Sequence, residues 1–193
     1  MRVIAGKYRS RRLQSLRGLA LRPTADRMRE TLFDVLCAGN PSALEGTVWV
    51  DFFAGSGAVG IEALSRGAAE VIFVEASPKA VALIEKNLRS LGISSGFRVL
   101  KTDVIQLLGK LGAIGQAADF VFLDPPYRMQ DAYRRILTGL GSAGVLRPST
   151  LVIAEHDRKF DPGGEFGAIR RYRTLQQRDG ALSFYARPTL AEA

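Results

Sequence analysis

The chain has 193 residues, 47% hydrophobic and 24% charged, and its net charge of +8 comes with one cysteine and one histidine. This composition is typical of one globular domain and excludes a wholly disordered or collagen-like chain. We expect a cytoplasmic protein with no membrane span, no signal peptide, no disulfide framework and no metal site.

The first predicted element is a short extended or hairpin segment over residues 1–22. It holds seven basic residues and no acidic one, and a weaker basic stretch follows at residues 170–178. A clustered positive charge favours contact with a nucleic-acid backbone, although a merely solvated surface has the same composition. The candidate RNA-binding residues are Lys7, Arg9, Arg11, Arg12, Arg22 and Arg27.

A helix over residues 25–37 follows, and then strands alternate with helices. Strands are predicted at 47–53, 71–76, 97–103, 118–124 and 151–156, and helices at 57–67, 77–92, 104–111 and 130–140. Continuous apolar strands in such a series predict a parallel sheet covered on both faces. The last predicted element is a hairpin at 172–187, turning around Asp179 and Gly180. We therefore expect an α/β, Rossmann-like, doubly wound and mainly parallel seven-stranded sheet, with the antiparallel hairpin at its C-terminal end. A small N-terminal extension (1–40) would precede the main domain (41–193).

A glycine loop, G-x-G-x-x-G at residues 55–60, lies between a predicted strand and a predicted helix. Glycines there allow a tight turn and a close approach of a ligand to the helix N-terminus. Glu75 lies 20 residues after Gly55, where a carboxylate can accept both hydroxyls of a ribose. This spacing fits a nicotinamide dinucleotide as well as S-adenosylmethionine.

Two further acids favour S-adenosylmethionine. Asp51 adds an anion that a pyrophosphate site does not need, and Asp103 can accept from an adenine amine, although it could simply cap the helix at 104–111. The candidate cofactor residues are Asp51, Phe53, Ala54, Gly55, Ser56, Gly57, Glu75, Ala76, Asp103 and Val104.

The tetrad Asp124, Pro125, Pro126 and Tyr127 follows the fourth parallel strand, at the end where open α/β sheets bind ligands. The Asp124 carboxylate and the Pro125 carbonyl can each accept one N–H of a nucleobase amine, which directs the nitrogen lone pair toward the incoming methyl group. Tyr127 offers a ring for an unstacked base. We expect Asp124 to act as a hydrogen-bond acceptor, not as a general base with a raised pKa.

With its glycine loop and LDPPY, the sequence resembles class I amino-methyltransferases that use S-adenosylmethionine. The segments RVIAGKYRSRRL (2–13) and RPTADRMRETLFDVL (22–36) are more specific. They resemble the bacterial 16S rRNA (guanine-N2)-methyltransferase family that modifies guanine 966 of the small subunit. The resemblance covers Arg2 to Arg187 and implies an N-terminal extension that contacts RNA, a monomer, and 16S rRNA within the assembled small subunit as substrate.

Three alternatives remain open from the sequence. The tetrad would also serve a DNA adenine-N6 methyltransferase, although the chain is short for a target-recognition domain. A nicotinamide-dependent oxidoreductase would leave the tetrad and Asp51 without a role. A non-catalytic RNA-binding assembly factor could keep the fold, but the intact Asp124 argues against lost activity.

Overall fold

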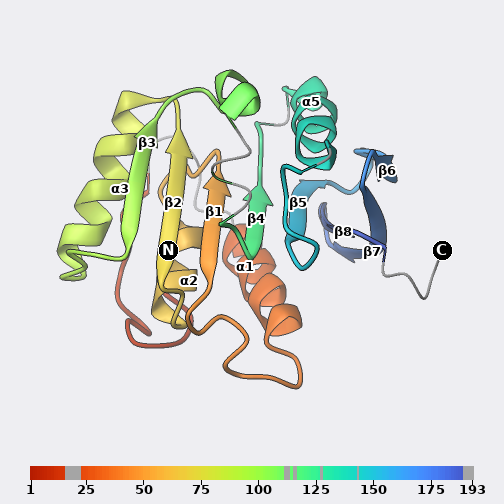
Figure 1. The fold of residues 1–193 in the computed structure, drawn as a ribbon. Coiled ribbons are helices and arrows are strands. Elements are labelled where there is room, and N and C mark those ends of the chain that lie inside the picture. Colours follow the sequence, from red (N-terminus) through yellow and green to blue (C-terminus); the bar gives the residue numbers. More distant parts are fainter. Residues whose placement is uncertain (16–22, 111–113, 115–116, 127, 143, 189–193) are drawn as a thin grey trace. The chain divides into compact units, whose positions relative to one another are not determined.

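The computed structural model describes residues 1–15, 23–110, 114, 117–126, 128–142 and 144–188, and it has a mixed α/β fold (Figure 1). The chain divides into two compact units, Met1–Thr102 and Asp103–Ala193. The domain boundary that the sequence suggests near residue 40 stays a prediction. No helix in the described ranges is long and apolar enough to cross a membrane.

The first unit contains three parallel strands in the order β3-β2-β1, each connected to the next through a helix (Figure 1). β1 and β2 are apolar and almost wholly buried, as strands covered on both faces must be. The predicted strand–helix alternation is confirmed here. The elements of this unit are α1 (Pro23–Leu36), β1 (Val48–Phe52), α2 (Ala58–Ser65), β2 (Glu70–Glu75), α3 (Pro78–Ser90) and β3 (Phe97–Lys101).

The N-terminal segment folds back on itself. Arg2 and Arg12 form an antiparallel bridge, and Val3 N–H donates to the Arg11 carbonyl at 3.0 Å. Val3 and Leu13 are buried, so this segment contributes apolar side chains to the first unit. The predicted hairpin is confirmed for residues 1–15.

The second unit combines one parallel pair, β4 and β5, with three antiparallel strands, in the order β4-β5-β8-β7-β6. The C-terminal hairpin is confirmed, and it turns at Arg178 and Asp179. Its elements are the 3₁₀ helix η1 (Val104–Lys110), β4 (Phe120–Leu123), α5 (Gln130–Gly141), β5 (Leu151–Asp157), β6 (Glu165–Phe166), β7 (Ile169–Gln177) and β8 (Gly180–Ala186).

The described residues form eight strands rather than seven. The additional strand, β6, has two residues, too few to give a periodic pattern in the sequence. It is held close to α5 because Ala168 N–H donates to the Gly141 carbonyl at 2.8 Å. A Cβ at Gly141 would lie 1.7 Å from the Phe166 carbonyl oxygen, so only glycine permits this approach.

Candidate functional site

The glycine loop lies in the first unit, between β1 and α2. Gly55 and Gly57 have φ angles of +56° and +76°, which favour glycine, and Phe53 adopts +60° although it carries a side chain. A Cβ at Gly55 would meet only the Phe53 carbonyl oxygen, at 3.8 Å, so the backbone is uncovered there. The loop therefore presents an open backbone surface next to the start of a helix, which is the arrangement that the sequence predicted.

Glu75 lies at the end of β2 and braces this loop. Its Oε2 accepts from Gly55 N–H at 2.9 Å, and its Oε1 accepts from Ser77 N–H at 2.8 Å. A carboxylate has about four lone-pair positions, so each oxygen can accept one further hydrogen bond. Glu75 is thus oriented by the loop and can still accept two hydroxyl groups.

Asp51 has a structural task that the sequence reasoning missed. Gly57 stands at the N-cap of α2 and has no side chain to cap the helix. Asp51, buried in β1, supplies the acceptor instead: its Oδ2 accepts from Gly60 N–H at 3.0 Å. An anion at a helix N-terminus is favourable. A contact between Asp51 and a cationic ligand stays a prediction.

Glu62 is the buried acid that anchors the N-terminal segment. Its two carboxylate oxygens accept from Ile4 N–H at 2.8 Å and from Ala5 N–H at 2.9 Å. Arg66 Nε lies 2.9 Å and Arg29 Nε 3.9 Å from the same carboxylate. The sequence offered one signal for this role, a lone acid within the apolar helix α2.

Asn87 connects the N-terminal segment to the glycine loop. Its Oδ1 accepts from Gln14 N–H at 2.8 Å, and its Nδ2 donates to the carbonyls of Gln14 at 3.0 Å and Ser56 at 2.9 Å. The side chain is fully buried on α3. The backbone of the basic segment and the backbone of the loop therefore share one hydrogen-bonding side chain.

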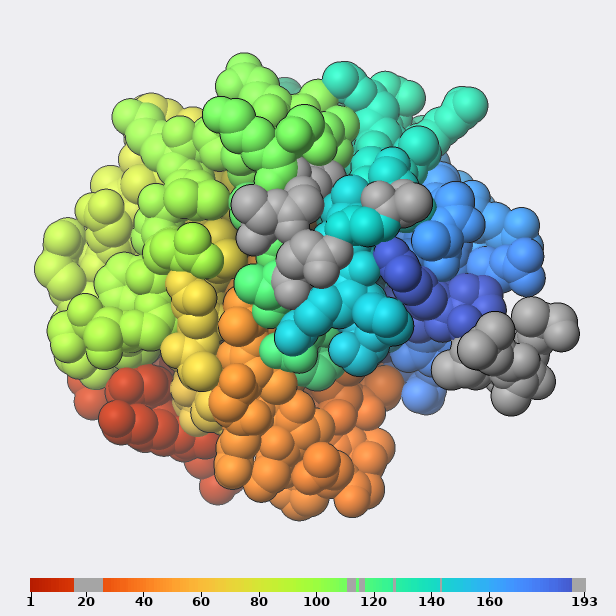
Figure 2. Space-filling view, viewed as in Figure 1, coloured from red at the N-terminus to blue at the C-terminus, as the bar shows by residue number. Residues whose placement is uncertain are grey.

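The basic residues of the N-terminal segment point to solvent. Lys7, Arg9, Arg11 and Arg12 are exposed, as is Arg27 on α1. Among the hydrogen bonds between described residues, Arg11 alone of these five donates to the backbone, at the Ser90 carbonyl. Figure 2 shows the segment, in red, on the surface of the first unit. A hollow of about 710 Å³ beside it is lined by Met1, Arg2, Ser10, Arg12, Leu13 and Asp26. Arg22 lies outside the described residues. Anion binding by this surface stays a prediction that its exposure favours.

Asp103 and Val104 begin the second unit. Asp103 Oδ1 accepts from Ile105 N–H at 2.7 Å, so the carboxylate caps η1, as one of the two readings of the sequence proposed. Val104 is buried. A contact between Asp103 and an adenine amine stays a prediction.

The tetrad follows β4 in the second unit, as predicted. The Pro126 carbonyl accepts from Met129 N–H at 2.7 Å, which closes the turn that leads into α5. Within the described part of the chain, the structure gives neither the Asp124 carboxylate nor the Pro125 carbonyl a hydrogen-bond donor. The two acceptors occupy adjacent positions in the chain, so one amine could donate to both. Tyr127 lies outside the described residues.

The expectation that Asp124 has an ordinary pKa is wrong. Asp124 is an exposed residue, and the protein atoms gathered around its carboxyl desolvate it and raise its pKa to about 7. Burial disfavours the charged form of an acid, so the carboxylate is held at an energetic cost near neutral pH.

The family model described as Conserved hypothetical protein 95 matches residues 1–186. Ribosomal RNA small subunit methyltransferase D of Haemophilus influenzae is 36% identical over 159 residues, covering 82% of this chain and 79% of that protein. YlbH of Bacillus subtilis is 34% identical over 161 residues, covering 83% of this chain and 85% of that protein. The solved structure of yhhF from Escherichia coli has a TM-score of 0.80 at 30% identity and covers 98% of each chain.

The family model spans nearly the whole chain, including the N-terminal segment, the glycine loop and the tetrad. The likeness to a solved structure extends over the same length. This chain therefore belongs to the family described as Conserved hypothetical protein 95, and its fold is that of the class I methyltransferases.

Proposed function

We propose that this protein methylates the exocyclic N2 amine of a guanine in 16S rRNA, at guanine 966, within the small ribosomal subunit. The broader activity is methylation of ribosomal RNA with S-adenosylmethionine, and relatives from Haemophilus influenzae and Escherichia coli carry the name Ribosomal RNA small subunit methyltransferase D. The observation that supports an amine as target is the pair of acceptors at the end of β4, the Asp124 carboxylate and the Pro125 carbonyl, for which the described residues supply no donor. The guanine and its position rest on the resemblance of segments 2–13 and 22–36.

The first unit fits an adenosyl cofactor. The uncovered backbone at Gly55 permits close approach, and Glu75 is fixed beside it with acceptor capacity for two ribose hydroxyls. When bound, S-adenosylmethionine supplies an electrophilic methyl group. The residues of the first unit that would hold it are those of the glycine loop and Glu75.

The second unit fits the target amine. An exocyclic amine is a poor nucleophile because its lone pair is delocalised into the base. Accepting one N–H at the Asp124 carboxylate and the other at the Pro125 carbonyl draws the nitrogen toward tetrahedral geometry and frees that lone pair. The prolines carry no competing N–H and restrict the backbone that orients the carbonyl.

The exposed arginines of the N-terminal segment support an RNA substrate. Arg9 and Arg12 are exposed, and neither has an ion pair in the ranges that the structure describes. Such side chains can neutralise phosphates and release counterions. Glu62 and Asn87 hydrogen-bond the backbone of this segment from α2 and α3, so the basic surface is attached to the first unit.

The test is methylation of small ribosomal subunits purified from cells that lack this gene. With labelled S-adenosylmethionine, mass mapping of the rRNA should locate N2-methylguanosine at position 966. Asp124→Ala should lower kcat about 10²–10³-fold, the range for removing one preorganised polar group from an active site. Asp131→Ala, an exposed acid in the first turn of α5, is the matched control and should keep the wild-type rate.

Two outcomes would overturn the proposal. Methyl transfer to adenine N6 of duplex DNA, with no transfer to subunits, would assign the tetrad to a DNA enzyme. A wild-type rate for Asp124→Ala would show that the tetrad is only a turn.

A further inference from the structure

β7 contains a bulge that redirects its arginines. Arg171 lies opposite Tyr185, but Arg173 lies opposite Phe184, the next residue of β8, so Tyr172 is an inserted residue. In a regular strand, residues two apart share a face. The bulge breaks this rule and places Arg171 and Arg173 on opposite faces of the hairpin.

The two faces differ in how their arginines are used. Arg171 forms a forked ion pair with Asp161, and the carboxylate neutralises the charge of the Arg171 guanidinium within the protein. Arg173 has no ion pair in the part of the chain that the structure describes, and its guanidinium lies 6.0 Å from the centre of the Phe184 ring. The bulge thus leaves one arginine available on the Phe184 side.

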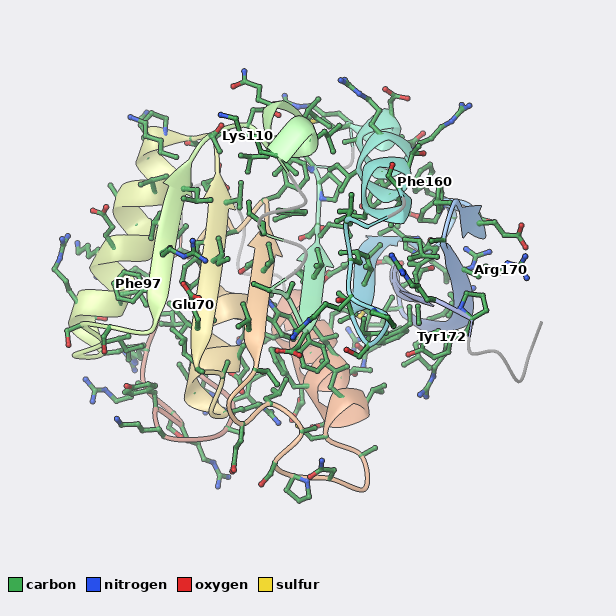
Figure 3. The ribbon with its side chains drawn as sticks, in the orientation of Figure 1. Glu70, Phe97, Lys110, Phe160, Arg170 and Tyr172 are labelled. Atoms are coloured by element: carbon green, nitrogen blue, oxygen red, sulfur yellow. The ribbon has the colours of Figure 1, made fainter. Side chains whose placement is uncertain are left out.

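Tyr172 lies on the same side of the hairpin. Its ring centre is 6.3 Å from that of Phe184, and its side chain is 60% exposed. Among the described residues it is the one large hydrophobic side chain that is exposed. Figure 3 shows Tyr172 and Arg170 on β7. The Tyr172 ring packs against Phe184 and leaves the rest of its surface exposed to a binding partner.

The surrounding charge indicates what the partner is. Residues 169–187 contain five arginines and one acid, Asp179. Arg170 is 3.6 Å from Glu165, but both side chains are exposed, and such surface pairs hold a charge only weakly. A single exposed ring flanked by arginines is too small an apolar patch for a membrane or an apolar protein surface. It matches the way in which proteins hold single-stranded nucleic acid, by stacking and phosphate contact.

We propose that Tyr172, Arg173 and Arg170 form a second RNA-binding surface, in which the Tyr172 ring stacks on an unpaired base and the two arginines contact phosphates. This inference rests on the proposed function, because the RNA is the rRNA substrate. It assigns RNA contact to the second unit as well as to the N-terminal segment of the first.

The test measures binding of purified small subunits from cells lacking this gene, and of the naked 16S rRNA, over a series of salt concentrations. Tyr172→Ala and Tyr172→Leu should each weaken binding to both RNAs by about 5–150-fold, the effect of losing one stacked base. Tyr172→Phe should bind within about twofold of wild type because it keeps the ring. The leucine variant preserves apolar contact with Phe184, so it separates stacking from folding.

Arg173→Gln should flatten the dependence of log Kobs on log salt by about 0.7–0.9. Arg89→Gln, which removes an equal charge from an exposed position on α3, should leave the slope unchanged. Affinity for S-adenosylmethionine should be unchanged in every variant, since these residues are proposed to contact the RNA and not the cofactor.

The outcomes distinguish this inference from the proposed function. If wild-type protein neither binds nor methylates the rRNA, the proposed function fails. If the wild type does both and Tyr172→Leu binds as tightly, only the second surface is refuted. Weaker binding to assembled subunits with unchanged binding to naked rRNA would assign the surface to a ribosomal protein and overturn the inference.

Discussion

Replacing Glu62 with Gln should loosen the N-terminal segment from the first unit. The carboxylate accepts two backbone N–H groups, from Ile4 and Ala5, and faces the guanidinium groups of Arg29 and Arg66. Glutamine retains one acceptor oxygen. Its NH₂ group would face a backbone donor in place of the other oxygen. Arg66 would lose its anionic partner at 2.9 Å, whereas Arg29 would keep Asp26 at 3.1 Å.

The size of the effect follows from burial. Glu62 is 0% exposed and the Arg66 side chain is 12% exposed, so water has little access to replace the lost partner. Breaking a buried ion pair by neutralising one side costs about 3–5 kcal/mol, a large part of the roughly 5–15 kcal/mol that stabilises a typical protein. For a chain of this length, that loss lowers the melting temperature by roughly 6–20 °C.

Thermal and urea unfolding followed by circular dichroism measure this loss, and hydrogen exchange at the Ile4 and Ala5 amides locates it. The matched control is Glu85→Gln, in which an exposed acid 3.9 Å from Arg89 loses its charge. Such a pair contributes less than about 0.5 kcal/mol. If Glu62→Gln unfolded within about 1 kcal/mol of wild type, Glu62 would not anchor the segment and the reasoning from burial would be refuted.

Two further predictions concern the same segment. Asn87→Ala removes three hydrogen bonds and should cost about 1–3 kcal/mol of stability while weakening S-adenosylmethionine binding, because the Ser56 carbonyl loses its donor; unchanged calorimetric affinity would contradict the link to the loop. Replacing Arg9, Arg11 and Arg12 together with Gln should reduce the salt slope of rRNA binding by about 2–3 without changing cofactor affinity. Lost thermal stability with normal rRNA affinity would instead assign these arginines a structural role.

Local sequence patterns predicted most of the helices and strands, because burial of apolar runs and capping of helix ends depend on residues that are close in the sequence. Apolar runs gave β1 and β2, and α3 begins at Pro78 after Ser77, whose Oγ accepts from Ala80 N–H at 3.4 Å, as the sequence indicates. The bulge at Tyr172 was not predictable, since it depends on how β7 aligns with β8 rather than on either strand alone. Pairing register is a property of two segments, and one sequence pattern does not carry it.

The candidate site also contains parts that a local sequence pattern predicts and parts that depend on distant residues. The glycine loop and the tetrad are short motifs at strand ends, so their positions could be predicted. Asn87 and Glu62 act on residues 73 and 58 positions away, and no local pattern names those partners. Asn87 does interrupt a buried stripe formed by Ala80, Ile84 and Leu88, which marks it as a buried polar residue in need of partners.

The raised pKa of Asp124 makes a specific prediction about pH. The acceptor is the carboxylate, and a protonated carboxyl would instead present an O–H to the amine. Because the Asp124 pKa is about 7, the active form is lost as the pH falls through neutrality, and roughly a tenth of the carboxyl is ionised one pH unit below that value. The rate constant kcat/KM should therefore rise about tenfold from pH 6 to pH 8.

Asp124→Asn keeps an acceptor oxygen that does not titrate, so its rate should be lower but flat over the same interval. Measured on small subunits at constant ionic strength, a flat wild-type profile, or an Asn variant that keeps the rise, would show that Asp124 ionisation does not control methyl transfer.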